Sequence, residues 1–376
     1  AALGALIFVD PTAYRNQIES RARAAFGREV RIAGSIHLKR SLRPQIVVED
    51  ISIGNPEWAK GPHFVTAEKV GLQVALFPLL RGDLRVLDVF FSGVNLFLEE
   101  SPDGEKNFFF GSRDGRQRTG LLPAIERLQI NSSLVTYKKS DGNSRHLTID
   151  TARLWNIPGE PERIEAQGST KDMPFTIVLS ADSAAELSSP QNPWSMQLDI
   201  NAPDMSLTIA GWMDDALKWN QGEYSIKLGG DHVDSLETLF DLDLPTSGAF
   251  ELSAKVNKTE RSLRVTDIAA HLQGTQPTPA IIISDGEASG GQDNPLHFAL
   301  QGQFGEDPFT FLIESTQPFQ DISQKTPWPI EAQINLADLK LNIESEMSPA
   351  TVTDRIEFKT QVQGKTLKTL SRLLDT

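Results

Sequence analysis

The residues best suited to chemistry are few in this chain and lie far apart. The histidines are His37, His63, His146, His232, His271 and His297, and none lies within five residues of another. This spacing lacks the paired histidines of a helix-borne metal site. The chain has no cysteine, which excludes disulfides, thiolate metal ligands and cysteine nucleophiles. The nucleophile elbow of hydrolases, the P-loop and the glycine fingerprint of dinucleotide binding are also absent. We therefore expect no enzyme activity, no metal and no cofactor.

Paired carboxylates are the remaining candidates for chemistry, because two acids that flank a glycosidic bond can hydrolyse it. Such pairs occur at Asp214-Asp215, at Asp241 and Asp243, and at Glu99-Glu100. The net charge of −14 and the pI near 5.0 make chance pairs common. Because the acidic residues are spread along the chain, they favour solubility as their role. Binding to nucleic acid needs clustered Lys and Arg, so we expect no nucleic-acid partner.

A large internal repeat is the most informative feature of the chain. Residues 165–243 recur as residues 299–374, at an offset of 134 up to Gly230 and, after a three-residue slip, with Leu236–Leu239 matching Leu367–Leu370. The matched segments include Gly168 with Gly302, Pro174-Phe175-Thr176 with Pro308-Phe309-Thr310, Pro193-Trp194 with Pro327-Trp328, and Leu207 and Ile209 with Leu341 and Ile343. Repetition of one large unit builds an extended surface. The repeat thus points to binding or conducting something long, and away from a single catalytic pocket.

Apolar residues alternate with polar ones almost everywhere after Arg28, which is typical of strands with one apolar face. Turn signals such as Asp103-Gly104 and Asp285-Gly286 separate the runs. Helices are few: Asp10 and Pro11 open one that ends near Gly27. Two short helical candidates cover 234–242 and 366–373. The sequence predicts a mostly β fold of long antiparallel strands with a short N-terminal helix and a few short helices.

The first nine residues, Ala1–Val9, are uncharged. They are too short to span a bilayer, which needs about 20 apolar residues. They suit a buried strand, the tail of a signal peptide, or the exit end of a transmembrane helix that has been cut, and we favour the last. The C-terminus also looks truncated, because the first copy of the repeat continues beyond the point where the second stops.

The apolar face of such strands must be covered, or it must bind something. A sandwich or barrel covers it with a second sheet, whereas a curved sheet leaves an apolar trough for acyl chains. Periodicity does not separate these two arrangements, nor does it say which parity of each strand faces inward. Our candidates for a lipid-binding trough are Leu72, Val74, Leu76, Leu96, Leu98, Leu207, Ile209, Leu341 and Ile343.

Four short motifs lie in order along the first 110 residues. They are the segment from Phe26-Gly27-Arg28 to Gly34, the turn Asn55-Pro56-Glu57-Trp58, the corner Pro78-Leu79-Leu80-Arg81-Gly82, and the segment from Asp103-Gly104 to Asn107-Phe108. In these motifs the chain resembles the AsmA family of bacterial envelope proteins. Phe108 stands where that family often has Trp. The repeats at 165–243 and 299–374 also look like the downstream β modules of this family.

The resemblance implies a periplasmic protein that an N-terminal helix anchors in the inner membrane. It also implies a groove-like, taco-shaped repeating sheet that carries phospholipid acyl chains toward the outer membrane. The expected division is 1–9 as the remnant of the membrane helix, 10–150 as an AsmA-like module, 151–298 as a first β repeat module and 299–376 as a second, truncated one. The expected partners are phospholipid or another acyl lipid, the inner membrane, and outer-membrane or periplasmic proteins.

Two functions from different classes fit these observations. The first is bridge-like lipid transfer between the inner and outer membranes, which supports outer-membrane biogenesis. The second is an envelope scaffold or assembly factor for outer-membrane proteins, which binds partners through open sheet edges. A conduit needs a continuous and uncovered apolar face, whereas a scaffold buries that face in a closed core.

Overall fold

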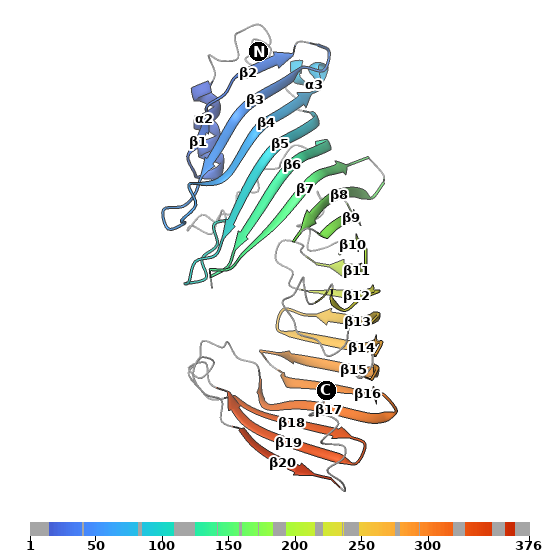
Figure 1. Cartoon of the computed structure of the whole chain (residues 1–376). Coiled ribbons are helices and arrows are strands. Elements are labelled where there is room, and N and C mark those ends of the chain that lie inside the picture. Colours follow the sequence, from blue (N-terminus) through green and yellow to red (C-terminus); the bar gives the residue numbers. More distant parts are fainter. Residues whose placement is uncertain are drawn as a thin grey trace. The chain divides into compact units, whose positions relative to one another are not determined.

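The protein is mostly β, as the alternation predicts, and Figure 1 shows its strands lying side by side. The computed structural model describes residues 15–39, 41–81, 85–108, 125–140, 142–157, 160–171, 173–182, 193–214, 221–234, 236, 248–274, 279–292, 294–318, 328–347 and 358–364. These ranges contain twenty strands, which form a long and largely antiparallel open sheet, and two helices. Curvature of this sheet into a groove stays a prediction. The chain divides into two compact units, residues 1–180 and 181–376, and the predicted module boundaries are not decided by this division.

The first unit contains both helices and the first nine strands. Its elements are α2 (Arg15–Phe26), β1 (Val30–Ile32), β2 (Ile36–Lys39), β3 (Gln45–Gly54), β4 (His63–Val74), α3 (Leu76–Leu80), β5 (Val86–Glu99), β6 (Ile125–Lys138), β7 (Ser144–Trp155), β8 (Glu162–Thr170) and β9 (Met173–Ala181). β1 and β2 lie end to end along β3 and both pair with it. The pairing of β5 with β6 is parallel.

The second unit is a run of antiparallel strands that pair in chain order. They are β10 (Trp194–Ala202), β11 (Met205–Met213), β12 (Gly222–Gly230), β13 (Phe250–Lys258), β14 (Ser262–Leu272), β15 (Ile281–Gly291), β16 (Pro295–Phe304), β17 (Asp307–Pro318), β18 (Trp328–Leu336), β19 (Leu339–Met347) and β20 (Phe358–Gln363). Each ladder among the described residues of this unit joins two strands that are consecutive in the sequence.

The internal repeat reappears in the bounds of these strands. At the offset of 134 residues, β10 and β11 of the first copy have the same bounds as β18 and β19 of the second copy. Trp194 and Trp328 begin the equivalent strands β10 and β18, each directly after a proline. The two copies therefore share one strand pattern as well as sequence matches.

Several predictions concern residues outside the described ranges. These are the apolar segment 1–9, the start of the first helix at Asp10 and Pro11, nearly all of the helical candidate 234–242, and the helical candidate 366–373. Among the helices of the described residues, none is both long enough and apolar enough to cross a membrane.

One candidate trough residue does not lie in a strand as expected. β4 ends at Val74, and Leu76 begins the short helix α3. Ala75 still donates a backbone hydrogen bond to Arg85, at 2.9 Å, so the ladder stops just before Leu76. Pro78 follows within α3, and proline has no N–H for a strand ladder. The alternation that runs up to Leu76 in the sequence is therefore not a strand at its last position.

A line of interruptions crosses the first unit from β3 to β7. Asp50 in β3 and Ser132 in β6 are non-glycine residues with positive φ, and Gly93 in β5 also has positive φ. The ladders place Gly93 between the paired residues on either side of Ser132, and Asp150 of β7 lies opposite Ser132 in the same way. Such residues break the two-residue alternation of a strand. We refer to Asp50, Glu68, Gly93, Ser132 and Asp150 as the interruption line.

Burial along the strands shows what the interruption line does. In β4 two consecutive residues, Glu68 and Lys69, are exposed, and in β6 the same is true of Asn131 and Ser132. In β6 the exposed positions are odd-numbered from Arg127 to Asn131 and even-numbered at Ser132 and Leu134, so the parity changes at this pair. The apolar residues before and after the interruption line therefore project to the same face of the sheet, although their numbering changes parity.

Candidate functional site

One face of the second unit is apolar from β10 to β20. Residues that lie opposite each other in a ladder project to the same face of the sheet. One row of such partners is Ile200, Leu207, Leu228, Leu252, Ala270, Ile283, Gly302, Phe309, Leu336 and Leu339. A second row is Val256, Val265, Ala288, Phe298, Ile313, Ala332 and Ile343. This apolar face contains no charged residue in either row.

The apolar face of the second unit is only partly covered. Most of its side chains are half-buried, and some are more exposed, such as Leu263 at 43% and Val362 at 52%. A closed sandwich would bury the inner face of each sheet in a shared core. Exposed apolar patches on neighbouring strands are a feature of surfaces that contact proteins, membranes or ligands.

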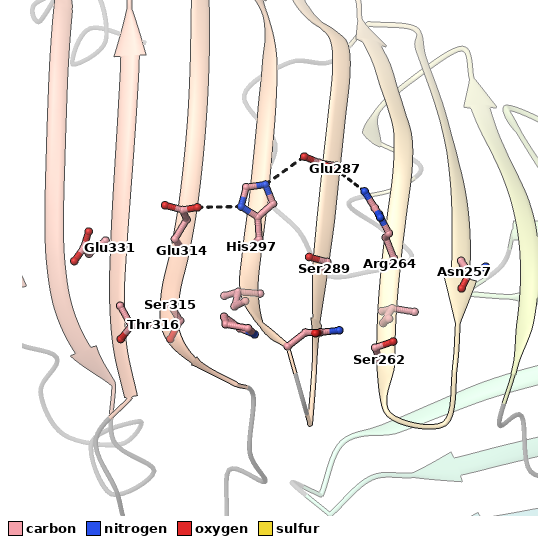
Figure 2. A pocket seen from close by; sticks show the side chains of 14 residues that line it. Asn257, Ser262, Arg264, Glu287, Ser289, His297, Glu314, Ser315, Thr316 and Glu331 are labelled. Atoms are coloured by element: carbon pink, nitrogen blue, oxygen red, sulfur yellow. Dashed lines mark hydrogen bonds and ion pairs between the residues drawn. The ribbon is translucent and has the colours of Figure 1, made fainter.

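The opposite face of the second unit is polar. The row next to the one that contains Val256 consists of Asn257, Arg264, Ser289, His297, Glu314, Glu331 and Glu344. On this face a shallow hollow of about 780 Å³ is lined mostly by polar residues from β13 to β18, together with Leu263, Pro295 and Leu296. Figure 2 shows Arg264, Glu287, His297 and Glu314 reaching toward one another across four neighbouring strands.

The contacts in this hollow are cross-strand ion pairs. His297 Nδ1 lies 3.2 Å from Glu314, its Nε2 lies 3.4 Å from Glu287, and Arg264 lies 3.5 Å from the same Glu287. Both ring nitrogens of His297 therefore face carboxylates, which leaves neither directed at Ser289 as a base would be. Exposed pairs of this kind contribute roughly 0 to 1 kcal/mol each to folding stability. Together they link β14, β15, β16 and β17 on the polar face.

Other ion pairs also join polar side chains on neighbouring strands. Arg127 of β6 bonds Asp88 of β5 through Nε at 2.7 Å, and this hydrogen bond raises the pKa of Arg127. Lys255 lies 2.8 Å from Asp267, and the hydrogen bond with Asp267 raises the pKa of Lys255. Among the described residues, no group of three or more His, Asp or Glu side chains is arranged to hold a metal ion.

The first unit also has an apolar face, and it runs across the interruption line. On one side of the line the rows contain Leu72 with Val89 and Leu128, and Val70 with Phe91 and Ile130. On the other side they contain Ala67 with Val94, and Val65 with Leu96 and Val135. A small core of Val74, Val86 and Val89 packs with Leu72, Phe91, Ile125 and Leu128.

The structure places the sequence-predicted trough residues as follows. Leu72 and Val74 lie in β4, and Leu96 and Leu98 lie in β5, on the far side of the interruption line. Leu207 and Ile209 of β11 and Leu341 and Ile343 of β19 all lie on the apolar face of the second unit. Leu76 is the exception described above. Whether these side chains contact a lipid stays a prediction.

Sequence reasoning missed the apolar residues that join the two copies of the repeat. Leu252, Ile283, Phe298, Leu300 and Phe309 continue the apolar face from β13 to β17. Their strands also alternate in the sequence, so this signal was present. Alternation within a strand does not give the register between strands. The ladders supply this register, and it places Leu207 and Leu339 in one row.

The motif segments of the first unit meet around one buried side chain, that of Asn107. Its Nδ2 donates to Asn55 Oδ1 at 2.9 Å and to the Phe97 carbonyl at 2.8 Å, and its Oδ1 accepts from Glu99 N–H at 2.8 Å. Arg28 donates to the Asn107 carbonyl and lies over the ring of Phe64, 4.8 Å from its centroid. We call Arg28, Asn55 and Asn107 the motif knot.

Burial gives the motif knot its electrostatic character. Asn107 has no exposed surface, and burial lowers the pKa of Arg28. The adjacent Glu99 is 4% exposed, accepts from Lys60 N–H at 2.9 Å and pairs with Lys138 at 3.3 Å. These bonds link the end of β5 to the turn after β3, so the knot holds together segments that are about 50 residues apart in the chain.

The motif knot draws on three of the four segments on which the AsmA resemblance rests. Residues 1–116 match the model of the AsmA family. This stretch is an AsmA family domain. The match confirms the resemblance expected from the motifs, and it places the AsmA domain in the first unit. No curated protein and no solved structure matches the chain. An AsmA domain points to the cell envelope, and AsmA proteins are not known as enzymes.

Proposed function

We propose that this protein binds acyl lipids on its apolar sheet face and transfers phospholipid between the inner and outer membranes of a bacterial envelope. In this proposal the protein acts in the periplasm, is anchored in the inner membrane by an N-terminal helix, and supports outer-membrane biogenesis. Acyl chains would lie against the apolar rows while headgroups stay in water. The observation that carries the proposal is the half-exposed apolar face that continues over the strands of the second unit.

The energetics suit a passive conduit. Burial of an acyl chain stabilises the bound lipid by about 0.8 kcal/mol for each CH₂ group. A row of apolar side chains lets a lipid move along the face without exposing this surface to water. Passive transfer of lipid needs no catalytic residue. This agrees with the polar hollow, where His297 lies between the carboxylates of Glu287 and Glu314.

The scaffold function is less well supported at the sheet edge next to α2. Ile32 N–H donates to Glu19 at 2.7 Å, and the carbonyls of Ile32 and Gly34 accept from Arg15 at 3.2 and 2.8 Å. These side chains occupy the N–H and carbonyl of Ile32 in β1 and the carbonyl of Gly34 just after it, groups that an added partner strand would need. An assembly factor that works by strand addition would keep such groups open.

The test compares Leu207→Asp with Ser206→Asp in the purified protein from a Gram-negative host. Leu207 lies on the apolar face, and its neighbour Ser206 lies on the polar face of the same strand. Native mass spectrometry with lipid extraction should find phospholipid on the parent and on Ser206→Asp, and little on Leu207→Asp, because a charge in the apolar path is costly to desolvate.

Circular dichroism of both variants checks that the sheet is retained. A parent that carries no lipid, or a Leu207→Asp variant that carries as much as the parent, would contradict the proposed function. The scaffold function would then become the leading hypothesis, and its test is a search for bound envelope proteins by cross-linking.

A further inference from the structure

An apolar hollow lies at one end of the strands of the second unit, between two neighbouring turns. It measures about 570 Å³ and is lined by the turn from Lys258 to Ser262, by the turn from Gly290 to Gln292, and by Leu263, Val265, Ala288 and Leu296. The four named side chains are all apolar, and Leu263 is 43% exposed. Gly290 contributes no side chain, and the nearest atoms to a Cβ there would be those of Leu296 at 3.8 Å. The hollow is therefore suited to one end of an acyl chain.

Two basic residues stand at the rim of this hollow. Lys258 pairs with Leu263 in the ladder and follows Val256 by two residues, so it lies at the end of the apolar face rather than on the polar face. Its Nζ donates to the Thr259 carbonyl at 3.3 Å. Arg261 lies in the same turn and is exposed. Both residues line the hollow, and so does the acidic Glu260. The rim therefore carries two positive charges and one negative charge beside an apolar surface.

The turn that carries these residues is held by several hydrogen bonds. Thr259 N–H donates to the Ser262 carbonyl at 2.8 Å, and Ser262 N–H donates to Thr259 Oγ1 at 3.0 Å. Gln292 N–H donates to the Arg261 carbonyl at 2.8 Å, which ties this turn to the next one along the sheet. A turn fixed in this way loses little conformational freedom when it binds a ligand.

Charge differs between the two ends of the strands. The described turns at the opposite end carry Asp204, Asp231, Glu306, Asp307 and Asp338. At the end with the hollow, Lys258 ends β13 and Arg261 lies in the following turn beside Glu260, while Asp182 and Asp214 lie near the ends of neighbouring strands. An anionic group would therefore be favoured near Lys258 and Arg261 and repelled at the opposite end.

We propose that the turn between β13 and β14 is a headgroup site for an anionic phospholipid, with Lys258 and Arg261 facing the phosphate and the apolar hollow holding the adjoining part of an acyl chain. This inference rests on the proposed lipid-binding function and adds a charge preference to it. Lys and Arg near a membrane-like surface each favour anionic headgroups, and phosphate is a strong acceptor for both side chains.

The experiment loads the purified protein with an equimolar mixture of phosphatidylglycerol and phosphatidylethanolamine that carry the same acyl chains. Native mass spectrometry then counts each bound lipid. The parent should be enriched in phosphatidylglycerol by roughly tenfold, as expected for two basic side chains near a headgroup. The double variant Lys258→Gln with Arg261→Gln should lose this enrichment while its total bound lipid stays close to that of the parent.

Two further variants make the result specific. Lys255→Gln removes the same charge from the polar face of β13, so it should keep the enrichment. The exchanged pair Lys258→Arg with Arg261→Lys keeps both charges in the turn and should keep it as well. Equal binding of the two lipids by the lipid-bearing parent, or an equal loss of preference in Lys255→Gln, would overturn the headgroup site. A parent that binds neither lipid would instead overturn the proposed function.

Discussion

At the scale of single residues, the amide of Asn107 does more than its small size suggests. It satisfies a donor or acceptor on Asn55, Phe97 and Glu99 at once, and no water-accessible surface remains to replace these bonds. Buried polar groups that lose their partners are costly, so this side chain cannot be exchanged without loss. These hydrogen bonds explain physically why an asparagine suits position 107, in the last of the four motifs.

We expect Asn107→Ala to destabilise the first unit by on the order of 3 kcal/mol, because several buried groups would lose their hydrogen bonds. Thermal unfolding followed by circular dichroism measures this change. Asn143→Ala, in the turn between β6 and β7, is a control at another asparagine near a hairpin turn. An equal and small effect of both substitutions would show that the motif knot contributes little to stability.

Gly93 is the glycine on which the interruption line depends most. Its φ is +61°, and a Cβ there would lie 2.3 Å from the Glu68 side chain. Gly93→Ala should therefore cost more stability than Gly104→Ala, whose φ of +80° is similarly strained but whose Cβ would meet nothing within 4 Å. A difference of about 1 kcal/mol or more is expected, and denaturant unfolding of the two variants measures it. Equal midpoints would mean that Glu68 moves aside at no cost.

At the scale of elements, helix α2 acts as a cover for strand β1. Uncovered edges invite pairing between chains, and Arg15 and Glu19 bond both the N–H and the carbonyl of Ile32. Figure 1 shows α2 running beside β1. Arg15 therefore has a structural role at the edge of the sheet.

The double variant Arg15→Ala with Glu19→Ala should expose the edge of β1 and promote self-association. Size-exclusion chromatography with light scattering would detect a shift from the parent's mass toward a larger species at high protein concentration. Arg21→Ala, an exposed position on the same helix, should leave the mass unchanged. A monomeric double variant would indicate that another feature protects this edge.

The sequence predicts much at the level of elements, and it fails where the backbone departs from regular alternation. Simple alternation puts Leu72 and Leu96 on opposite faces, because Leu72 pairs with Val89, an odd-numbered partner in the strand that holds Leu96. The interruption line brings them to one face. Asp50 and Ser132 adopt positive φ without being glycines, so residue type gives no warning of the break. The motif knot was equally hidden, since its members are distant in the chain and each reads as an ordinary turn residue.

At the scale of the whole molecule, the two faces of the sheet differ in kind. Charged side chains such as Arg264, Glu287 and Glu314 gather on the polar face (Figure 2), whereas the rows through Leu207 and Val256 contain none. This asymmetry was predictable from alternation alone within each strand. Its continuity over neighbouring strands was not, because it requires each ladder to keep apolar residues opposite apolar ones.

Pairing in chain order has a consequence for how damage spreads. In the second unit each ladder joins strands that follow one another in the sequence, so stability is close to a sum of nearest-neighbour terms. Phe250→Ala, at a side chain that is 3% exposed, should speed amide hydrogen exchange in β12–β14 and leave β17–β19 as protected as before. Uniformly faster exchange would instead mean that the unit opens as a single cooperative block. Local opening would let one strand lose its backbone pairing while the remaining strands of the unit stay folded.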